Sequence, residues 1–112
     1  MTENQFTELF SKYGNACEYY DKEKQEQVTV YNLWRGPDNK FSLSYHLKFP
    51  QKNVQFNFLL DRLSYINSKE SVTISFYNGN KKHEKDKLKN IFTTRNINDL
   101  KKEVERIFKE YK

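Results

Sequence analysis

Residues 27–49 read QVTVYNLWRGPDNKFSLSYHLKF and carry the strongest structural signal in the sequence. Apolar and polar side chains alternate on both sides of the segment GPDN at 36–39, whose residue types favour a tight turn. Alternation with a period of two is typical of β-strands that are buried on one face. We therefore expect a β-hairpin with strands at 27–35 and 40–49.

A loop of four residues would pair Arg35 with Lys40 and would thereby set which side chains share a face. In that register the larger apolar side chains point toward the core. They are Val28, Val30, Trp34, Phe41, Leu43, Tyr45 and Leu47. We expect four of them to be buried against four residues of a C-terminal helix: Trp34, Phe41, Leu43 and Leu47 against Leu100, Val104, Ile107 and Phe108.

The opposite face of the hairpin combines Tyr31 and Leu33 with basic side chains, hydroxyl groups and a histidine. An aromatic and an aliphatic group among such polar groups form a composition suited to protein recognition. If this face is open, its partner-binding residues are Tyr31, Leu33, Arg35, Lys40, Ser42, Ser44, His46 and Lys48. The alternative is that a helix, such as one near the N-terminus, covers the face.

Helices and further strands follow from the spacing of apolar residues elsewhere in the chain. Spacings of three and four residues predict helices at 3–13, 53–66 and 97–111, and alternation predicts strands at 16–20, 72–77 and 91–94. A period of two also fits residues 54–60, so a strand there is the alternative. The resulting order is approximately α-β-β-β-α-β-β-α. We expect an α+β fold in a single domain, 1–112, with an antiparallel sheet and helices packed mainly on one face.

The composition supports a small folded domain without disulfides. Of the 112 residues, 16% are aromatic and 36% are hydrophobic, so aromatic rings must supply much of the core. The lone cysteine, Cys17, cannot form an internal disulfide, which suits a reducing compartment. Neither a signal peptide nor a run of about 20 apolar residues is visible. We expect a cytoplasmic protein with no membrane association.

Positive charge is concentrated in the second half of the chain. The net charge is +5, from 20 basic and 15 acidic side chains. A polar loop at 81–89 holds a basic cluster that could contact phosphate through Lys81, Lys82, Lys85, Lys87 and Lys89. Glu84 and Asp86 interrupt this cluster and no aromatic residue is interleaved for base stacking, so a solvated loop is the alternative.

Residue patterns that support catalysis or metal binding are missing from the sequence. The two histidines, His46 and His83, have no second histidine or cysteine at ligand spacing, and the three glycines are isolated from one another. Cys17 and His46 could form a nucleophile and a base, but a structural cysteine is the simpler interpretation. Asp38 is a turn residue without a second carboxylate on the neighbouring strand. We expect no catalytic residues, no metal and no cofactor.

These observations favour binding over catalysis. We expect a non-catalytic protein-binding module, such as an inhibitor, an adaptor, an immunity protein or a chaperone, from a phage or mobile element and acting on a host or defence protein. A protein is therefore the expected partner. The alternative is an accessory protein that binds DNA or RNA through the basic C-terminal half.

Overall fold

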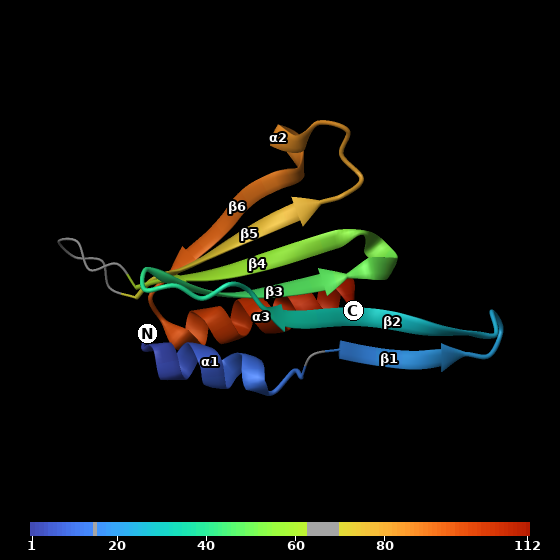
Figure 1. The fold of residues 1–112 in the computed structure, drawn as a ribbon, viewed down its shortest axis with the longest axis horizontal. Coiled ribbons are helices and arrows are strands. Elements are labelled where there is room, and N and C mark those ends of the chain that lie inside the picture. Colours follow the sequence, from blue (N-terminus) through green and yellow to red (C-terminus); the bar gives the residue numbers. More distant parts are fainter. Residues whose placement is uncertain (15, 63–69) are drawn as a thin grey trace.

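The fold is built on a six-stranded antiparallel sheet in which each strand pairs with its neighbours in chain order (Figure 1). The computed structural model describes residues 1–14, 16–62 and 70–112, without the side chains of residues 16 and 17. The strands are β1 (Ala16–Asp21), β2 (Glu26–Arg35), β3 (Ser42–Phe49), β4 (Val54–Asp61), β5 (Val72–Asn78) and β6 (Leu88–Thr94). The helices are α1 (Glu3–Ser11), α2 (Glu84–Lys87) and α3 (Ile97–Tyr111), with a 3-10 turn, η1 (Pro50–Lys52), after β3.

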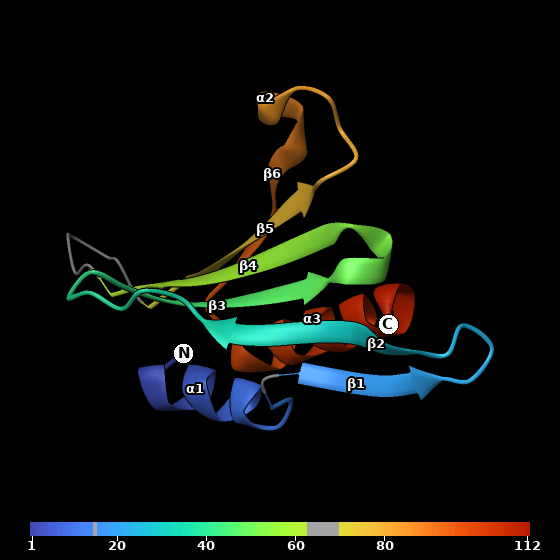
Figure 2. The ribbon, with the colours of Figure 1, turned by 45° about the vertical axis from the view of Figure 1, so that its right-hand side comes forward.

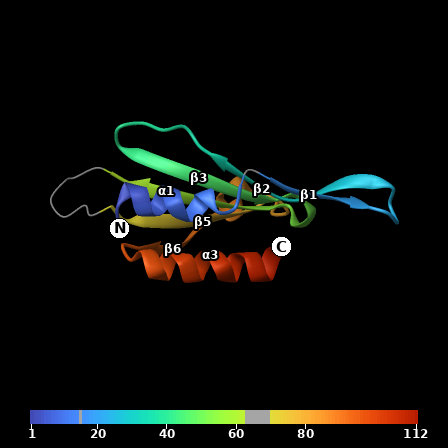
Figure 3. The same cartoon turned by 90° about the horizontal axis from the view of Figure 1, so that it is seen from below.

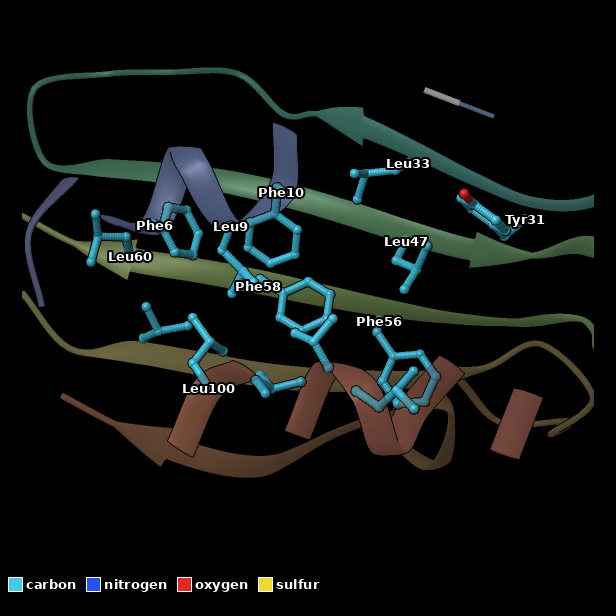
Figure 4. Close-up of a cluster of buried hydrophobic side chains, with 14 of the residues drawn as sticks. Phe6, Leu9, Phe10, Tyr31, Leu33, Leu47, Phe56, Phe58, Leu60 and Leu100 are labelled. Atoms are coloured by element: carbon cyan, nitrogen blue, oxygen red, sulfur yellow. The ribbon is translucent and has the colours of Figure 1, made fainter. Parts of the chain in front are cut away.

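Both longer helices pack on the same face of the sheet, which confirms the predicted α+β class. α3 lies along one side of the strands (Figure 3), and α1 lies beside the end of β2 (Figures 1 and 2). Side chains from both helices join those of the sheet in one hydrophobic core (Figure 4). The helices contribute Phe6, Leu9 and Phe10 from α1 and Leu100, Val104 and Ile107 from α3.

Polar caps set where the two longer helices begin. The Thr2 hydroxyl accepts a hydrogen bond from the Gln5 N–H at 3.2 Å, and the Gln5 side chain accepts one from the Thr2 N–H at 2.8 Å. At the start of α3, the side-chain oxygen of Asn96 accepts hydrogen bonds from the N–H groups of Asn98 and Asp99. Both helix starts are therefore determined by local sequence.

Residues 54–61 form a strand, so the helix predicted at 53–66 is wrong for this part of the chain. β4 lies between β3 and β5 and pairs with both. Its buried side chains alternate with more exposed ones: Val54, Phe56, Phe58 and Leu60 are buried. Leu59, which a helical stripe would bury, is 43% exposed. The spacing of apolar residues in 54–60 fits both a helix and a strand, and pairing of this segment with a strand on each side favours the strand. Residues 63–66 lie outside the described residues.

The register of the β2–β3 hairpin differs from the predicted one by five residues. Arg35 pairs with Tyr45 instead of Lys40, because the connection spans 36–41. The side chain of Asn39 closes this longer loop by accepting hydrogen bonds from the backbone N–H groups two and three residues further on. A shift by an odd number of residues moves every side chain of one strand to the other face.

This shift exchanges the faces of β2 from residue 31 onward. Val28 is buried and Val30 packs against the core, as predicted, because the pairing of β2 with β1 is irregular at residue 30. Tyr31 and Leu33, predicted on an open face, are 7% and 3% exposed and belong to the core. Trp34, predicted in the core, is 43% exposed on the opposite face, and Phe41 is 45% exposed in the loop. Phe108 is partly buried against the core. The other predicted core residues are buried: Leu43, Leu47, Leu100, Val104 and Ile107.

Arg62 holds the β2–β3 loop in place from the end of β4. Its guanidinium pairs with Asp38 in the loop and, at 3.2 Å, with Glu3 of α1. It also donates a hydrogen bond to the Ser42 carbonyl at 2.8 Å. The planar guanidinium, with five donors, suits such a convergence of acceptors. The length of the loop therefore depends on a residue 20 positions or more away in the sequence.

Candidate functional site

The candidate site is the face of the sheet that points away from α1 and α3, which we call the open face. It consists of alternate residues of β2 to β6, which the strand pairings arrange in three transverse rows. The central row is Trp34, His46, Asn57, Ser75 and Asn90. The flanking rows are Asn32, Lys48, Gln55, Tyr77 and Leu88 on one side and Gly36, Ser44, Leu59, Thr73 and Thr93 on the other.

Two stacked rings begin the central row. The Trp34 indole and the His46 imidazole belong to paired residues of β2 and β3, with ring centroids 4.1 Å apart and planes 10° apart. Stacking of this kind adds about 0.5–1.5 kcal/mol beyond the burial of the rings. Trp34 still remains 43% exposed. It therefore presents a large apolar surface in a fixed orientation.

Hydrogen bonds hold both nitrogens of the His46 ring. Nδ1 lies 2.8 Å from Oδ1 of Asn57, and the same oxygen accepts a hydrogen bond from Nε2 of Gln55 at 2.7 Å. Because this oxygen is an acceptor, Nδ1 of His46 is the donor, and Nε2 forms a hydrogen bond with the Ser44 hydroxyl at 3.1 Å. The His46 ring is thus fixed from two strands, and it supports Trp34.

Gly36 makes room for this network. It is buried, and its N–H donates a hydrogen bond to the Ser44 carbonyl at 3.0 Å. A Cβ atom at position 36 would lie 2.2 Å from Oγ of Ser44 and 2.3 Å from Nε2 of His46. Any side chain there would displace both atoms. The glycine of the turn is therefore needed for the surface around Trp34 as well as for the hairpin.

Ser44, His46 and Asn57 have the hydrogen-bond order of a nucleophile, a base and an orienting group. Such a triad acts only with an accessible nucleophile and with N–H donors directed at the developing oxyanion. Ser44 is 7% exposed, and its hydroxyl lies over Gly36. We therefore interpret these three residues as a hydrogen-bond network that holds the His46 ring in place beneath Trp34.

The centre of the open face carries almost no charge. Of the fifteen positions in the three rows, only Lys48 has a formal charge at neutral pH. Hydroxyl, amide, aromatic and aliphatic groups occupy the others, and Leu59 and Tyr77 are 43% and 37% exposed. A surface with few charged residues and with exposed aromatic residues is typical of the centre of a protein interface.

No protein-family model, no curated protein and no solved structure matches this chain significantly. Within the described residues, no helix is both long and apolar enough to cross a membrane. The same part of the chain holds no group of three or more His, Cys, Asp or Glu side chains that could bind a metal ion. The Cys17 side chain, considered above as a nucleophile beside His46, lies outside the described part.

The eight predicted partner-binding residues lie in three places. On the open face lie Ser42, Ser44, His46 and Lys48. Tyr31 and Leu33 lie in the core, because the register of β2 differs from the predicted one. Arg35 is the last residue of β2 and Lys40 lies in the β2–β3 loop, where Arg35 forms an ion pair with Asp38 at 2.8 Å.

Trp34 is one of the site residues that reasoning from the sequence missed. Its face depends on the length of the β2–β3 loop, and a four-residue loop assigns it to the core. The available signal was Asn39, since asparagine side chains stabilise turns by binding N–H groups two and three residues ahead. A loop extended to residue 41 on that basis is compatible with Trp34 opposite His46.

The predicted phosphate-contact residues gather around α2 and the start of β6 (Figure 2). Four of them are exposed and one is partly exposed: Lys81, Lys82, Lys85 and Lys89, with Lys87. Glu84 and Asp86 are exposed among them. The cluster is therefore a solvated surface of mixed charge, separate from Trp34 and His46.

Proposed function

We propose that the chain is a non-catalytic protein-binding module whose contact surface is the open face, with Trp34 at one end of the central row. The supporting observation is an indole ring that is 43% exposed yet held in one orientation by His46. A rigid aromatic side chain loses little conformational entropy when a partner covers it, and such residues dominate binding energies at interfaces. An inhibitor, an adaptor, an immunity protein or a chaperone would use a surface of this kind.

The proposed partner is a protein with an apolar pocket for the indole and an uncharged surround that forms hydrogen bonds. The hydroxyl and amide groups of the open face, such as those of Thr73, Ser75 and Asn90, can both donate and accept. Lys48 is the only charge in the three rows. A strongly charged partner surface would lose hydration on this face without gaining ion pairs.

The size of the open face also suits a protein partner. With strands about 4.8 Å apart and alternate residues about 6.6 Å apart, each position on one face covers about 32 Å², so the fifteen positions present roughly 500 Å². Each partner in an interface of standard size buries about 800 Å². The open face therefore supplies more than half of the area that one partner buries in a stable complex.

Nucleic acid is the second candidate, supported by the net charge of +5 and the cluster around α2. Phosphate binding requires several cations on the contact surface, because each neutralised phosphate contributes to affinity. The rows of the open face supply only Lys48. The charge distribution thus favours a protein partner for this face.

Insertion of a charge at Trp34 on the open face tests the proposal. The wild-type chain captures its partner from the native host, and calorimetry then gives Kd for wild type, Trp34→Lys and Phe41→Lys. Both variants replace an exposed aromatic ring by an ammonium group, but Phe41 lies in the loop. We expect Trp34→Lys to weaken binding by at least about 30-fold, as at an interface hot spot. Equal effects of the two variants would contradict the proposal.

Fluorescence anisotropy with random-sequence DNA and RNA tests the second candidate. We expect no binding at physiological ionic strength. Binding that falls steeply with salt, is weakened by Lys85→Glu and is unchanged in Trp34→Lys would replace the protein partner with nucleic acid.

A further inference from the structure

β1 forms one edge of the sheet. In the view from below, α1 lies in front of the neighbouring part of the sheet, whereas no element of the described residues lies in front of β1 (Figure 3). The β1–β2 hairpin also extends beyond the end of α3 (Figures 1 and 2). Between Glu18 and Asp21, β1 pairs regularly with β2. Its outward N–H and C=O groups are therefore available to a further strand.

The opposite edge of the sheet is protected in ways that β1 is not. β6 contains Lys89, and its pairing with β5 is irregular in the middle. Lysines and irregularities of this kind discourage the addition of a strand. β1 contains neither lysine nor proline, and its irregularity lies near its start. Tyr19 and Tyr20 are instead 46% and 56% exposed and, as consecutive residues, point to opposite faces.

Charge selects the kind of strand that β1 can accept. Residues 16–27 contain four carboxylates and two lysines, a net charge of −2 in a chain of net charge +5. The carboxylates are Glu18, Asp21, Glu23 and Glu26. A second copy of β1 would bring like charges together, which is unfavourable in paired strands. The complementary occupant is an extended segment rich in lysine or arginine.

We propose that β1 binds an extended, basic segment of a partner protein by strand addition. Backbone hydrogen bonds to β1 hold the segment, and its apolar side chains pack on Tyr19 and Tyr20. Its basic side chains approach Glu18, which is exposed on β1. This edge is separate from the three rows of the open face, so the inference does not depend on the proposed function.

The test uses a short, end-blocked peptide of alternating lysine and valine as the probe. It is titrated against the ¹⁵N-labelled full chain while amide chemical shifts are recorded. We expect saturable shifts at residues 18–21. A peptide N-methylated at consecutive central residues keeps its charge but loses its backbone donors. We expect it to bind at least about tenfold more weakly, because two or three hydrogen bonds are lost.

Two charge reversals on the protein complete the test. Glu18→Lys should weaken binding of the unmodified peptide by about threefold to tenfold, because it places like charges opposite each other. Glu8→Lys, on an exposed position of α1, changes the net charge equally and should leave binding almost unchanged. Equal binding of the N-methylated peptide, shifts centred on β6 or no shifts at millimolar peptide would overturn the proposal. Self-association that Glu18→Lys abolishes would assign β1 to a second copy instead.

Discussion

The Trp34 indole lies flat against the His46 imidazole, 4.1 Å from centroid to centroid, on the exposed side of the β2–β3 pair. The residue before it, Leu33, points the other way and is 3% exposed in the core. Neighbouring residues of one strand thus serve different purposes. Leu33 contributes to stability, whereas Trp34 is free to contact a partner.

Truncation of these two residues should therefore have different effects on stability. We expect Leu33→Ala to lower the free energy of unfolding by about 2–5 kcal/mol, because it leaves a cavity in the core. Trp34→Ala should lower it by about 1 kcal/mol, mainly through loss of the stacked pair. Urea denaturation of both variants measures the difference. A loss in Trp34→Ala as large as that in Leu33→Ala would contradict the register described above.

Gly36→Ala should destabilise the hairpin by about 1–3 kcal/mol, because the new methyl group would overlap Oγ of Ser44 and Nε2 of His46. Gly14→Ala is the matched control. No atom lies within 4 Å of a Cβ at Gly14, so its cost comes only from the positive φ of 63° and should be about 1 kcal/mol. Denaturation midpoints and the ring proton shifts of His46 report the two effects. Unchanged His46 signals in Gly36→Ala would show that the network does not need the glycine.

Two phenylalanines that the sequence assigns to one core should behave differently. Phe108 stacks on Tyr13, with centroids 4.6 Å apart, and meets the edges of Tyr31 and Phe49. Phe108→Ala should cost about 3 kcal/mol. Phe41→Ala, at a ring that is 45% exposed in a loop, should cost less than about 0.5 kcal/mol. Similar losses in urea denaturation would argue against the loop position of Phe41.

Arg62→Lys should destabilise the protein by about 1–2 kcal/mol, because a single ammonium group cannot satisfy the acceptors that converge on the guanidinium. Arg106→Lys is the control. Arg106 forms ion pairs with Glu103 and Glu110 on the exposed surface of α3, and its replacement should cost less than about 0.5 kcal/mol. Thermal unfolding of both variants makes the comparison. Equal stability would show that Arg62 does not set the loop.

Alkaline pH should weaken the fold partly through Tyr13. Burial raises the pKa of its phenol above the ordinary value of 10, and Glu105 and Tyr31 add to this rise. The folded protein thus holds this proton more tightly than the unfolded chain. The stabilisation is complete below the unfolded pKa and is lost as pH rises through the higher folded pKa. Tyr13→Phe keeps the stack on Phe108 and should reduce the loss of stability above about pH 10. An unchanged slope in urea denaturation against pH would exclude this role.

Only part of the candidate site could be predicted from the sequence. Ser44 and His46 were predicted on the correct face, because their alternation within β3 does not depend on the partner strand. Trp34 was assigned to the core, because its face depends on the loop length, and Arg62 helps to hold that loop from outside the hairpin. For β4, helical and strand periods both fit Phe56 and neighbouring residues, and pairing with β3 and β5 decided between them.

The α+β class, the hairpin at its centre and the starts of both longer helices could be predicted from local sequence. These features depend on local spacing and on caps such as Thr2 and Asn96, whose partners lie within three residues. Which face of β2 is buried depends instead on tertiary contacts. Pairing of Leu33 with Leu47 buries both side chains under the helices, whereas a shift by an odd number of residues would expose Leu33 and bury Trp34. That choice depends on contacts between distant residues, which is why the surface proposed for binding emerges only from the folded chain.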